Sequence, residues 1–513
     1  MRIVTIGGSV AGLALGIFAA RRGHQVTVLD ADPLTDPGLG FDERAARLTR
    51  GPTPQAAHSH AFLALARRIL ADEAPEVLAA LTDLGAETVA LADRLPATLA
   101  DRSPRPGDGQ LVATLARRST FEAALRLVAA SQPGLQLRAG TTVTGLVVDG
   151  PGRPTGAPPH VVGVEVAPNG GGRSTTAPPG GRRGRHRPEQ LRAELVVDAS
   201  GRRGRVPAWL ADLGVEVATT ESECGIAYYS RFYRLHLGER TGPLNRGYTA
   251  GSSFDRYSAL VFPADNDTFS VTFGILPEDG PLRKLRHDEA FHAAAGSIPV
   301  VAGWVERATP VTPSRSMMGL TNRLRRLVDP ATGRPLVTGL VAIADAAAIS
   351  NPAHSRGCSL ALAHALGLAR LLDTGPSPDE LAPAADAVVD ELLRPWVEDS
   401  HRQDQARLAR WRPDGGHGAP EVPAGEVTNG QAWVAAHHDR EVWSAFTRLQ
   451  QLLATGPEVL ADPEVVSRVG RVADAGLGLP ALPAPTHDEL AALVAANAPA
   501  PGRGEPGRLA RAV

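Results

Sequence analysis

The chain has almost no lysine and almost no cysteine. Lys284 is the only lysine among its 513 residues, which removes most chemistry that depends on a lysine side chain. The two cysteines, Cys224 and Cys358, lie far apart in the sequence. They imply neither a disulfide framework nor a cysteine zinc site, so we expect a reducing environment and no metal ion.

Strong net charge and long apolar runs are also missing. The formal net charge of -2 argues against recognition of nucleic acid or an anionic membrane by bulk charge. No apolar run has the length of a membrane span, and the N-terminus lacks the pattern of a signal peptide. We therefore expect a cytoplasmic protein without a transmembrane segment. Its 513 residues, 43% of them hydrophobic, can bury a large core, whereas the oligomeric state stays open.

The first thirty residues contain the most informative local pattern. A short apolar strand over residues 2–6 leads into a glycine-rich turn, a helix of small residues and a second strand over residues 25–30. This order is typical of the first unit of a dinucleotide-binding domain. It predicts a site for an ADP group.

Five residues of this unit are expected to form the site. Gly7 permits a sharp turn, and Gly12 allows the helix to approach the strand closely. Ser9 occupies the usual position of the middle glycine and brings a hydroxyl near the phosphates, with Ala11 beside it at the helix N-terminus. Asp30, which ends the second strand, is expected to accept a hydrogen bond from a ribose hydroxyl.

The remainder of the chain alternates between helical and strand-like segments. Helical spacing covers residues 60–84 with a break at Pro75, and Ser119 with Glu122 predicts a capping box for the next helix. Residues 257–262 and 268–273 alternate as in an antiparallel sheet. We expect disorder in the Gly-Pro-Arg-rich stretch 168–192, which has almost no apolar residues, and in residues 498–513.

A second motif spans residues 339–361, where a strand is followed by Asp345, a proline loop, a glycine and an alanine-rich helix. It resembles the second FAD motif of the flavoprotein monooxygenases related to aromatic hydroxylases. The resemblance implies that Asp345 binds the ribityl hydroxyls of noncovalently bound FAD. It also implies that the loop 351–357 passes the isoalloxazine ring, so that Pro352 and Gly357 form the flavin-facing loop near the reaction and Cys358 lies beside the cofactor.

Two positions depart from the pattern of that motif. Ala344 stands where the family usually has a glycine before the aspartate, and Ser355 replaces the first glycine of the proline loop. These departures leave the placement of individual flavin contacts open.

A third match narrows the resemblance. The segments 51–60 and 116–122 are similar to those of a subgroup of actinobacterial flavoproteins that includes epoxidases acting on polyketide alkenes. By that resemblance Arg118 contacts the FAD phosphate or ribityl region, and Gln55 and His58 lie near the cofactor. His60 has the alternative of a helix-start residue satisfied by the backbone.

Together these motifs predict an α/β fold: a Rossmann-like FAD-binding domain with a three-layer ββα architecture, an inserted antiparallel-sheet substrate domain and a C-terminal helical region. The expected FAD-binding domain is discontinuous and covers residues 1–85, 113–215 and 333–375. The substrate domain covers 86–112 and 216–332, and the helical region covers 376–497.

The family resemblance implies the reaction. Such enzymes use NADPH or NADH as a transient reductant of FAD and insert one oxygen atom of O2 by hydroxylation or epoxidation. We expect a small hydrophobic substrate, a polyketide- or terpenoid-like secondary metabolite, with Tyr228, Phe262 and Phe273 as walls of its site. The alternative is an FAD-dependent reductase or dehydrogenase of an isoprenoid-type double bond. Flavin halogenases use an active-site lysine, and Lys284 lies in no comparable context.

Overall fold

The computed structural model describes residues 1–33, 54–149, 156–168, 189–412 and 421–499. A five-stranded parallel sheet forms its centre, in the order β18 (Leu340–Ala342), β9 (Leu195–Asp198), β1 (Arg2–Ile6), β2 (Gln25–Asp30) and β5 (Leu135–Ala139). The strands pair in parallel because each connection crosses over through other elements before the chain returns to the sheet.

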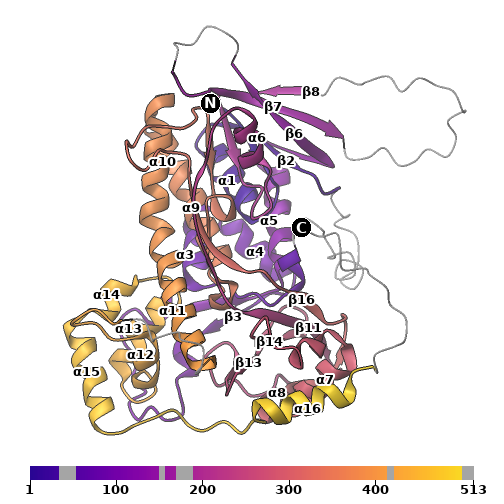
Figure 1. Ribbon diagram of the computed structural model, residues 1–513, viewed down its shortest axis with the longest axis vertical. Helices are drawn as coiled ribbons and strands as arrows, with labels where there is room; N and C mark the ends of the chain where they lie inside the picture. Colours follow the sequence, from indigo (N-terminus) through magenta and orange to yellow (C-terminus); the bar gives the residue numbers. More distant parts are fainter. Residues whose placement is uncertain (34–53, 150–155, 169–188, 413–420, 500–513) are drawn as a thin grey trace, which may run out of the picture.

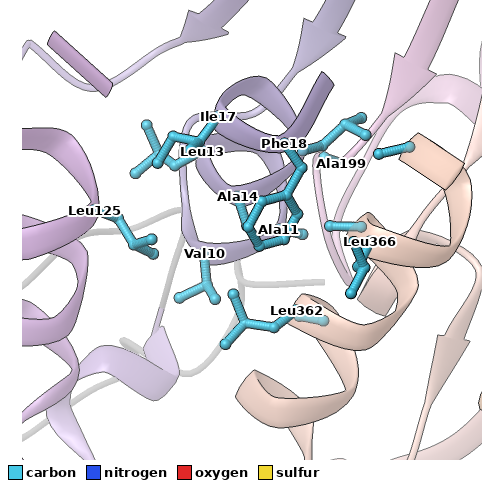
Figure 2. Packing of buried hydrophobic residues seen from close by; sticks show 14 of the residues in the cluster. Val10, Ala11, Leu13, Ala14, Ile17, Phe18, Leu125, Ala199, Leu362 and Leu366 are labelled. Carbon is cyan, nitrogen blue, oxygen red and sulfur yellow. The ribbon is translucent and has the colours of Figure 1, made fainter. Parts of the chain in front are cut away.

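Three helices cover one face of this sheet: α1 (Val10–Arg21), α5 (Arg118–Ser131) and α9 (Gly357–Asp373). Helix α1 is apolar nearly all round, because it packs between its two neighbours as well as on the sheet. Figure 2 shows this packing, with Leu125 of α5 on one side of α1 and Leu362 and Leu366 of α9 on the other.

An antiparallel sheet covers the other face of the parallel sheet. It consists of β6 (Thr141–Val148), β7 (Val161–Pro168) and β8 (Glu189–Arg192). Its apolar side chains, Val161 and Val164 among them, pack against Val4 and Val196 of the parallel sheet. The three layers are those predicted, but the expectation of disorder over residues 168–192 was wrong at its end, because residues 189–192 pair with β7. Residues 169–188 and 500–513 lie outside the described part.

A larger antiparallel sheet forms the second unit, with β12 (Ala250–Ser253), β13 (Tyr257–Pro263), β14 (Thr268–Ile275), β11 (Ala227–Leu235) and β15 (Ala308–Pro310) in that order. Strand β16 (Arg315–Met317) also pairs with β11. Helices α7 (Asp288–Gly296), α8 (Pro299–Val305) and α16 (His487–Asn497) pack on one face (Figure 1). The other face turns toward the parallel-sheet unit.

Shorter elements join the two units. Strand β17 (Thr321–Arg326) pairs with β10 (Ala218–Glu223) and β19 (Ala348–Ile349), and β3 (Glu87–Ala90) pairs with β4 (Val112–Leu115). Helices α3 (Ala64–Glu73) and α4 (Pro75–Asp83) confirm the break predicted at Pro75, which occupies the first turn of α4. Helix α6 (Val206–Asp212) follows β9.

The C-terminal region is helical, as predicted. The helices that follow α9 and precede α16 are α10 (Pro378–Leu392), α11 (Arg394–Trp411), α12 (Asn429–Ala435), α13 (Arg440–Gln450), α14 (Gly456–Leu460) and α15 (Pro463–Asp474). Aspartates Asp439 and Asp462 begin α13 and α15 by accepting hydrogen bonds from first-turn N–H groups. None of the helices in the described ranges combines the length and the apolar composition that crossing a membrane requires. The predicted fold class is confirmed.

Candidate functional site

A large cavity lies between the helix layer and the larger antiparallel sheet. Its empty volume is about 1510 Å³ with the open mouth included. Most of the residues expected at a cofactor line it: Ser9, Ala11, Gln55, His58, Arg118, Asp345, Pro352, Gly357 and Cys358. Sequence positions more than 300 residues apart therefore form one site, as the two motifs together predict.

Two helix N-termini face this cavity without a cap. Ser9 precedes α1 and Arg356 precedes α9, but neither side chain hydrogen-bonds to the N–H groups of the first turn. Neither first turn contains an acidic residue. Because the first N–H groups of a helix have no partner within the helix and carry a partial positive charge, both ends are suited to anionic or electron-rich ligand groups.

Gly7 and Gly12 shape the first of these helix ends without lining the cavity. Gly7 has φ +109°, a conformation that other residues rarely adopt. A Cβ on Gly12 would collide with the carbonyl oxygen of Gly7. The two glycines therefore allow α1 to start directly over the end of β1.

Asp30 lies at the end of β2, outside the residues that line the cavity. Its Oδ1 accepts a hydrogen bond from the Asp32 N–H at 3.0 Å, and its Oδ2 lies 3.5 Å from Nη2 of Arg126. Arg126 also donates to the carbonyl oxygen of Gly8 at 3.3 Å. Arg126, which belongs to none of the sequence motifs, therefore links the end of β2 to the glycine turn.

Ser9, Arg118 and Glu122 form a polar triangle at the start of α1. The Ser9 hydroxyl donates to Oε1 of Glu122 at 2.6 Å, Nη2 of Arg118 donates to the Ser9 Oγ at 2.9 Å, and Nε of Arg118 lies 2.9 Å from the same Glu122 oxygen. The predicted capping box of Ser119 and Glu122 was wrong, because α5 begins two residues earlier, with Arg117 as its N-cap. Glu122 instead orients the serine and the arginine.

Asp345 follows a strained turn after β18. Ala344 has φ +50°, so the residue that replaces the family glycine adopts a left-handed conformation. The N–H of Ala344 donates to Nδ1 of the buried His364 on α9 at 3.0 Å. Burial raises the pKa of the Asp345 carboxyl, and the nearby guanidinium of Arg118 opposes this effect.

The wall next to the larger sheet is formed by His58, Ser59 and His60, and the first two contact hydroxyls of that sheet. Nδ1 of His58 shares a hydrogen bond of 2.9 Å with Ser230 Oγ, which in turn lies 2.7 Å from Thr272 Oγ1. His60 donates from Nδ1 to the carbonyl oxygen of His58 at 2.9 Å, as its backbone-satisfied interpretation predicts, but it also lines the cavity. Burial lowers the pKa of His58 to about 4 and that of His60 to about 3, so both are neutral near pH 7.

The loop after β19 is held from behind by α11. The backbone N–H of Asn351 donates to Ser400 Oγ at 2.9 Å, and the side-chain Nδ2 of Asn351 donates to Oδ1 of Asp404 at 2.6 Å. Arg356 at the end of the loop forms a buried ion pair with Asp399 of the same helix at 2.6 Å. Ser355 has φ +54°, so the second replaced glycine is also in the left-handed region.

The aromatic residues expected at a substrate site do not line the cavity. Phe262 pairs with Ser270 across β13 and β14, whereas Phe273 pairs with Ala259, which puts the two phenylalanines on opposite faces. Phe273 lies in the core beneath the sheet, edge-on to Phe291 with ring centroids 5.2 Å apart. Tyr228 is on the same face as the cavity but is buried, and its hydroxyl donates to Oδ1 of Asn351 at 2.9 Å.

No protein-family profile and no curated protein matches the sequence, but solved structures match over most of the chain. The flavin-dependent brominase Bmp2 has a TM-score of 0.57 at 16% identity, covering 93% of this chain and 100% of that one. The structure of pqsL, a probable FAD-dependent monooxygenase from Pseudomonas aeruginosa, has a TM-score of 0.53 at 14% identity and covers 80% of this chain and 98% of its own. A flavoprotein/dehydrogenase from Cytophaga hutchinsonii has a TM-score of 0.57 at 13% identity, and the match covers 93% of this chain and 100% of that one.

The chain has the fold of FAD-dependent monooxygenases. Brominase Bmp2 shares this fold, so the fold alone does not separate oxygenation from halogenation. The only lysine of the chain, Lys284, lies in the turn 282–286 beside α7 and is not among the residues that line the cavity.

The residues at the cavity fit FAD. The uncapped start of α1, with Arg118 beside it, supplies N–H donors and positive charge for a pyrophosphate. Asp345 supplies a carboxylate for ribityl hydroxyls, and the uncapped start of α9 is suited to an electron-rich ring. Asp30 at the end of β2 remains the predicted partner of the adenosine ribose.

Proposed function

We propose that this protein is an FAD-dependent monooxygenase that inserts one oxygen atom of O2 into a small organic substrate. The observation that carries the proposal is the arrangement of two uncapped helix N-termini, Arg118 and Asp345 around one cavity. FAD would supply the oxygen chemistry, with NADPH or NADH as its reductant. The chain supplies the binding, the orientation and the exclusion of water.

The roles of the site residues follow from their places. Ser9, Ala11 and Arg118 would hold the pyrophosphate, with Gly7 and Gly12 giving the turn its shape. Asp345 would hold the ribityl chain, and Gln55, His58 and Cys358 would contact the cofactor from the other walls.

The flavin-facing loop is proposed to position the reacting oxygen. Pro352 and Gly357 are exposed toward the cavity, and the N–H groups at the start of α9 carry no cap. Fixed N–H donors stabilise negative charge that develops during a reaction without the cost of reorienting solvent. The ion pair between Arg356 and Asp399 holds this loop in place.

The substrate is proposed to be a polyketide- or terpenoid-like secondary metabolite, in keeping with the similarity of residues 51–60 to the epoxidase subgroup. Among solved structures of this fold, PqsL of P. aeruginosa has been determined in complex with 2-aminobenzoylacetate, which is a small molecule. The absence of a lysine from the residues lining the cavity argues against halogenation.

Two measurements test the proposal. Flavin released by denaturation should be FAD and not FMN, because the start of α1 is suited to an ADP group. With candidate substrates, NADPH and labelled O2, one labelled oxygen atom should enter the product per turnover. A product that gains two hydrogens and no oxygen would establish the reductase alternative instead, and protein that binds no FAD after reconstitution would contradict the proposal as a whole.

A further inference from the structure

Three arginines lie close to the buried carboxyls of Asp345 and Asp198, and we call them the arginine cluster: Arg202, Arg323 and Arg325. Arg202 follows β9 and lines the cavity, whereas Arg323 and Arg325 are two residues apart on β17 and share one face of that strand. Nη2 of Arg323 donates to the carbonyl oxygens of Arg202 at 3.1 Å and of Asp345 at 3.4 Å. Arg202 donates to the carbonyl oxygen of Gly319, at the wall formed by the sheet unit.

In the described part of the chain the arginine cluster has no carboxylate partner. Within the described ranges, no carboxylate oxygen lies within 4.0 Å of its guanidinium nitrogens, whereas the next residue on β17, Arg326, pairs with Asp386. Nε and Nη1 of Arg325 are buried and have no hydrogen-bond partner among the described residues, and Arg323 is only 8% exposed. Because a buried cation is costly without an anionic partner, this arrangement leaves a charge for a ligand to satisfy.

The acidic side chains around the cluster form no ion pair with it among the described residues. Asp345 and Asp198 are buried carboxyls close to the cluster, but neither carboxyl hydrogen-bonds to its guanidinium groups; Arg323 donates only to the backbone oxygen of Asp345. Asp198 already accepts hydrogen bonds from the N–H and hydroxyl of Ser200. Glu221 is the cross-strand neighbour of Arg323 on β10, but its side chain is exposed.

We propose that the arginine cluster forms a subsite for an oxyanion, a carboxylate or a phosphate, on a ligand other than FAD. The proposal rests on the function proposed above, in which the FAD pyrophosphate occupies the start of α1 and Arg118. Guanidinium groups bind carboxylate and phosphate oxygens through paired N–H donors. The ligand is therefore an acidic substrate or the phosphate-bearing nicotinamide cofactor. In the first case the hydrophobic substrate expected from the sequence would also carry an acidic group.

Calorimetric titration of the flavin-loaded protein tests this subsite without requiring turnover. The probes are benzoate, its neutral counterpart benzamide, and NADPH. We expect benzoate or NADPH to bind, and Arg323→Gln and Arg325→Gln to weaken that binding by about tenfold each, as for loss of a charge-assisted hydrogen bond. Arg323→Lys should recover part of the loss. Arg205→Gln, on the same loop as Arg202 but outside the lining residues, is the matched control and should change neither affinity.

The two sources of the oxyanion give different results. A loss confined to benzoate assigns the subsite to an acidic substrate, and a loss confined to NADPH assigns it to the reductant. Three results would overturn the subsite. The first is that benzamide binds as tightly as benzoate while the variants leave NADPH binding unchanged. The others are that the unaltered protein binds neither benzoate nor NADPH, or that the variants lose FAD. The absorbance of bound FAD before each titration reports separately on the proposed function. Should Arg323→Gln not fold, Arg325→Gln, at a half-buried position, decides the question alone.

Discussion

Replacing Asp345 by asparagine should separate cofactor binding from folding. The carboxylate lines the cavity directly after a strained turn, where the family resemblance places a ligand of the ribityl hydroxyls. Losing a hydrogen bond to a charged group costs about 1.5–3 kcal/mol. The dissociation constant of FAD should therefore rise by about 10- to 150-fold. Titration of the apoprotein with FAD, followed by flavin fluorescence, measures this change.

Stability should respond differently to the same substitution. Burial raises the pKa of the Asp345 carboxyl, so the charged form is less stable in the folded protein than in the unfolded chain. At neutral pH the carboxylate therefore costs folding free energy, and removing its charge should leave the Tm of the apoprotein unchanged or higher. A lower Tm would mean that the carboxylate has a structural role.

Asp373→Asn is the matched control for this experiment. Asp373 ends α9, the helix that starts at the cavity, and it pairs with Arg22 at 3.0 Å far from the lining residues. We expect it to leave FAD affinity unchanged. The reasoning about the site would be refuted if Asp345→Asn kept full affinity or if both variants lost affinity equally.

Four further substitutions test other parts of the structure. Arg118→Ala should weaken FAD binding by about tenfold in the same titration, because it removes a cation beside the start of α1. Ala344→Gly should raise the Tm or leave it unchanged, since glycine adopts φ +50° without the strain of about 1 kcal/mol. Burial lowers the pKa of His364 from 6.5 to about 4, so between these pH values the unfolded chain binds more protons than the folded protein. The free energy of unfolding should therefore fall as the pH decreases from 6.5 to about 4. In chemical denaturation His364→Gln should reduce this pH dependence by about 1.4 kcal/mol per pH unit. Phe273→Ala should cost about 3–5 kcal/mol of stability through a core cavity and leave the product profile unchanged, whereas a changed profile would return Phe273 to the substrate site.

Local patterns predicted the parts of the site that single segments form. The glycine turn, its helix and Asp30 lie within thirty consecutive residues, so the strand, turn and helix preferences of one stretch determine their arrangement. The same holds for Asp345 and α9. Family resemblance then placed Arg118 at the cofactor, and the structure brings it within 2.9 Å of Ser9.

Contacts between distant segments could not be predicted in this way. The residues around Glu122 predict that it caps its own helix, but its side chain instead accepts a hydrogen bond from Ser9, 113 positions away in the sequence. The alternating pattern of β14 predicts that the strand has two faces, but it does not show which of them lies toward the cavity. Phe273 is on the face that lies away from the cavity. The arginine cluster joins residues 202 and 323 through a contact that no local pattern contains.

The C-terminal helices belong to the site for the same reason. Asn351 is fully buried, and its side chain both donates to Asp404 and accepts from Tyr228. Buried polar groups that lose their partners are costly, so α11 and the sheet unit together fix the backbone at the start of the flavin-facing loop. Arg356 is fixed at the other end by Asp399, with its guanidinium 4.7 Å from the ring of Trp396. The loop proposed to position the reacting oxygen is thus held at both ends by α11, which lies outside the nucleotide-binding layers, so the geometry of this loop depends on the helical region as well as on the two FAD motifs.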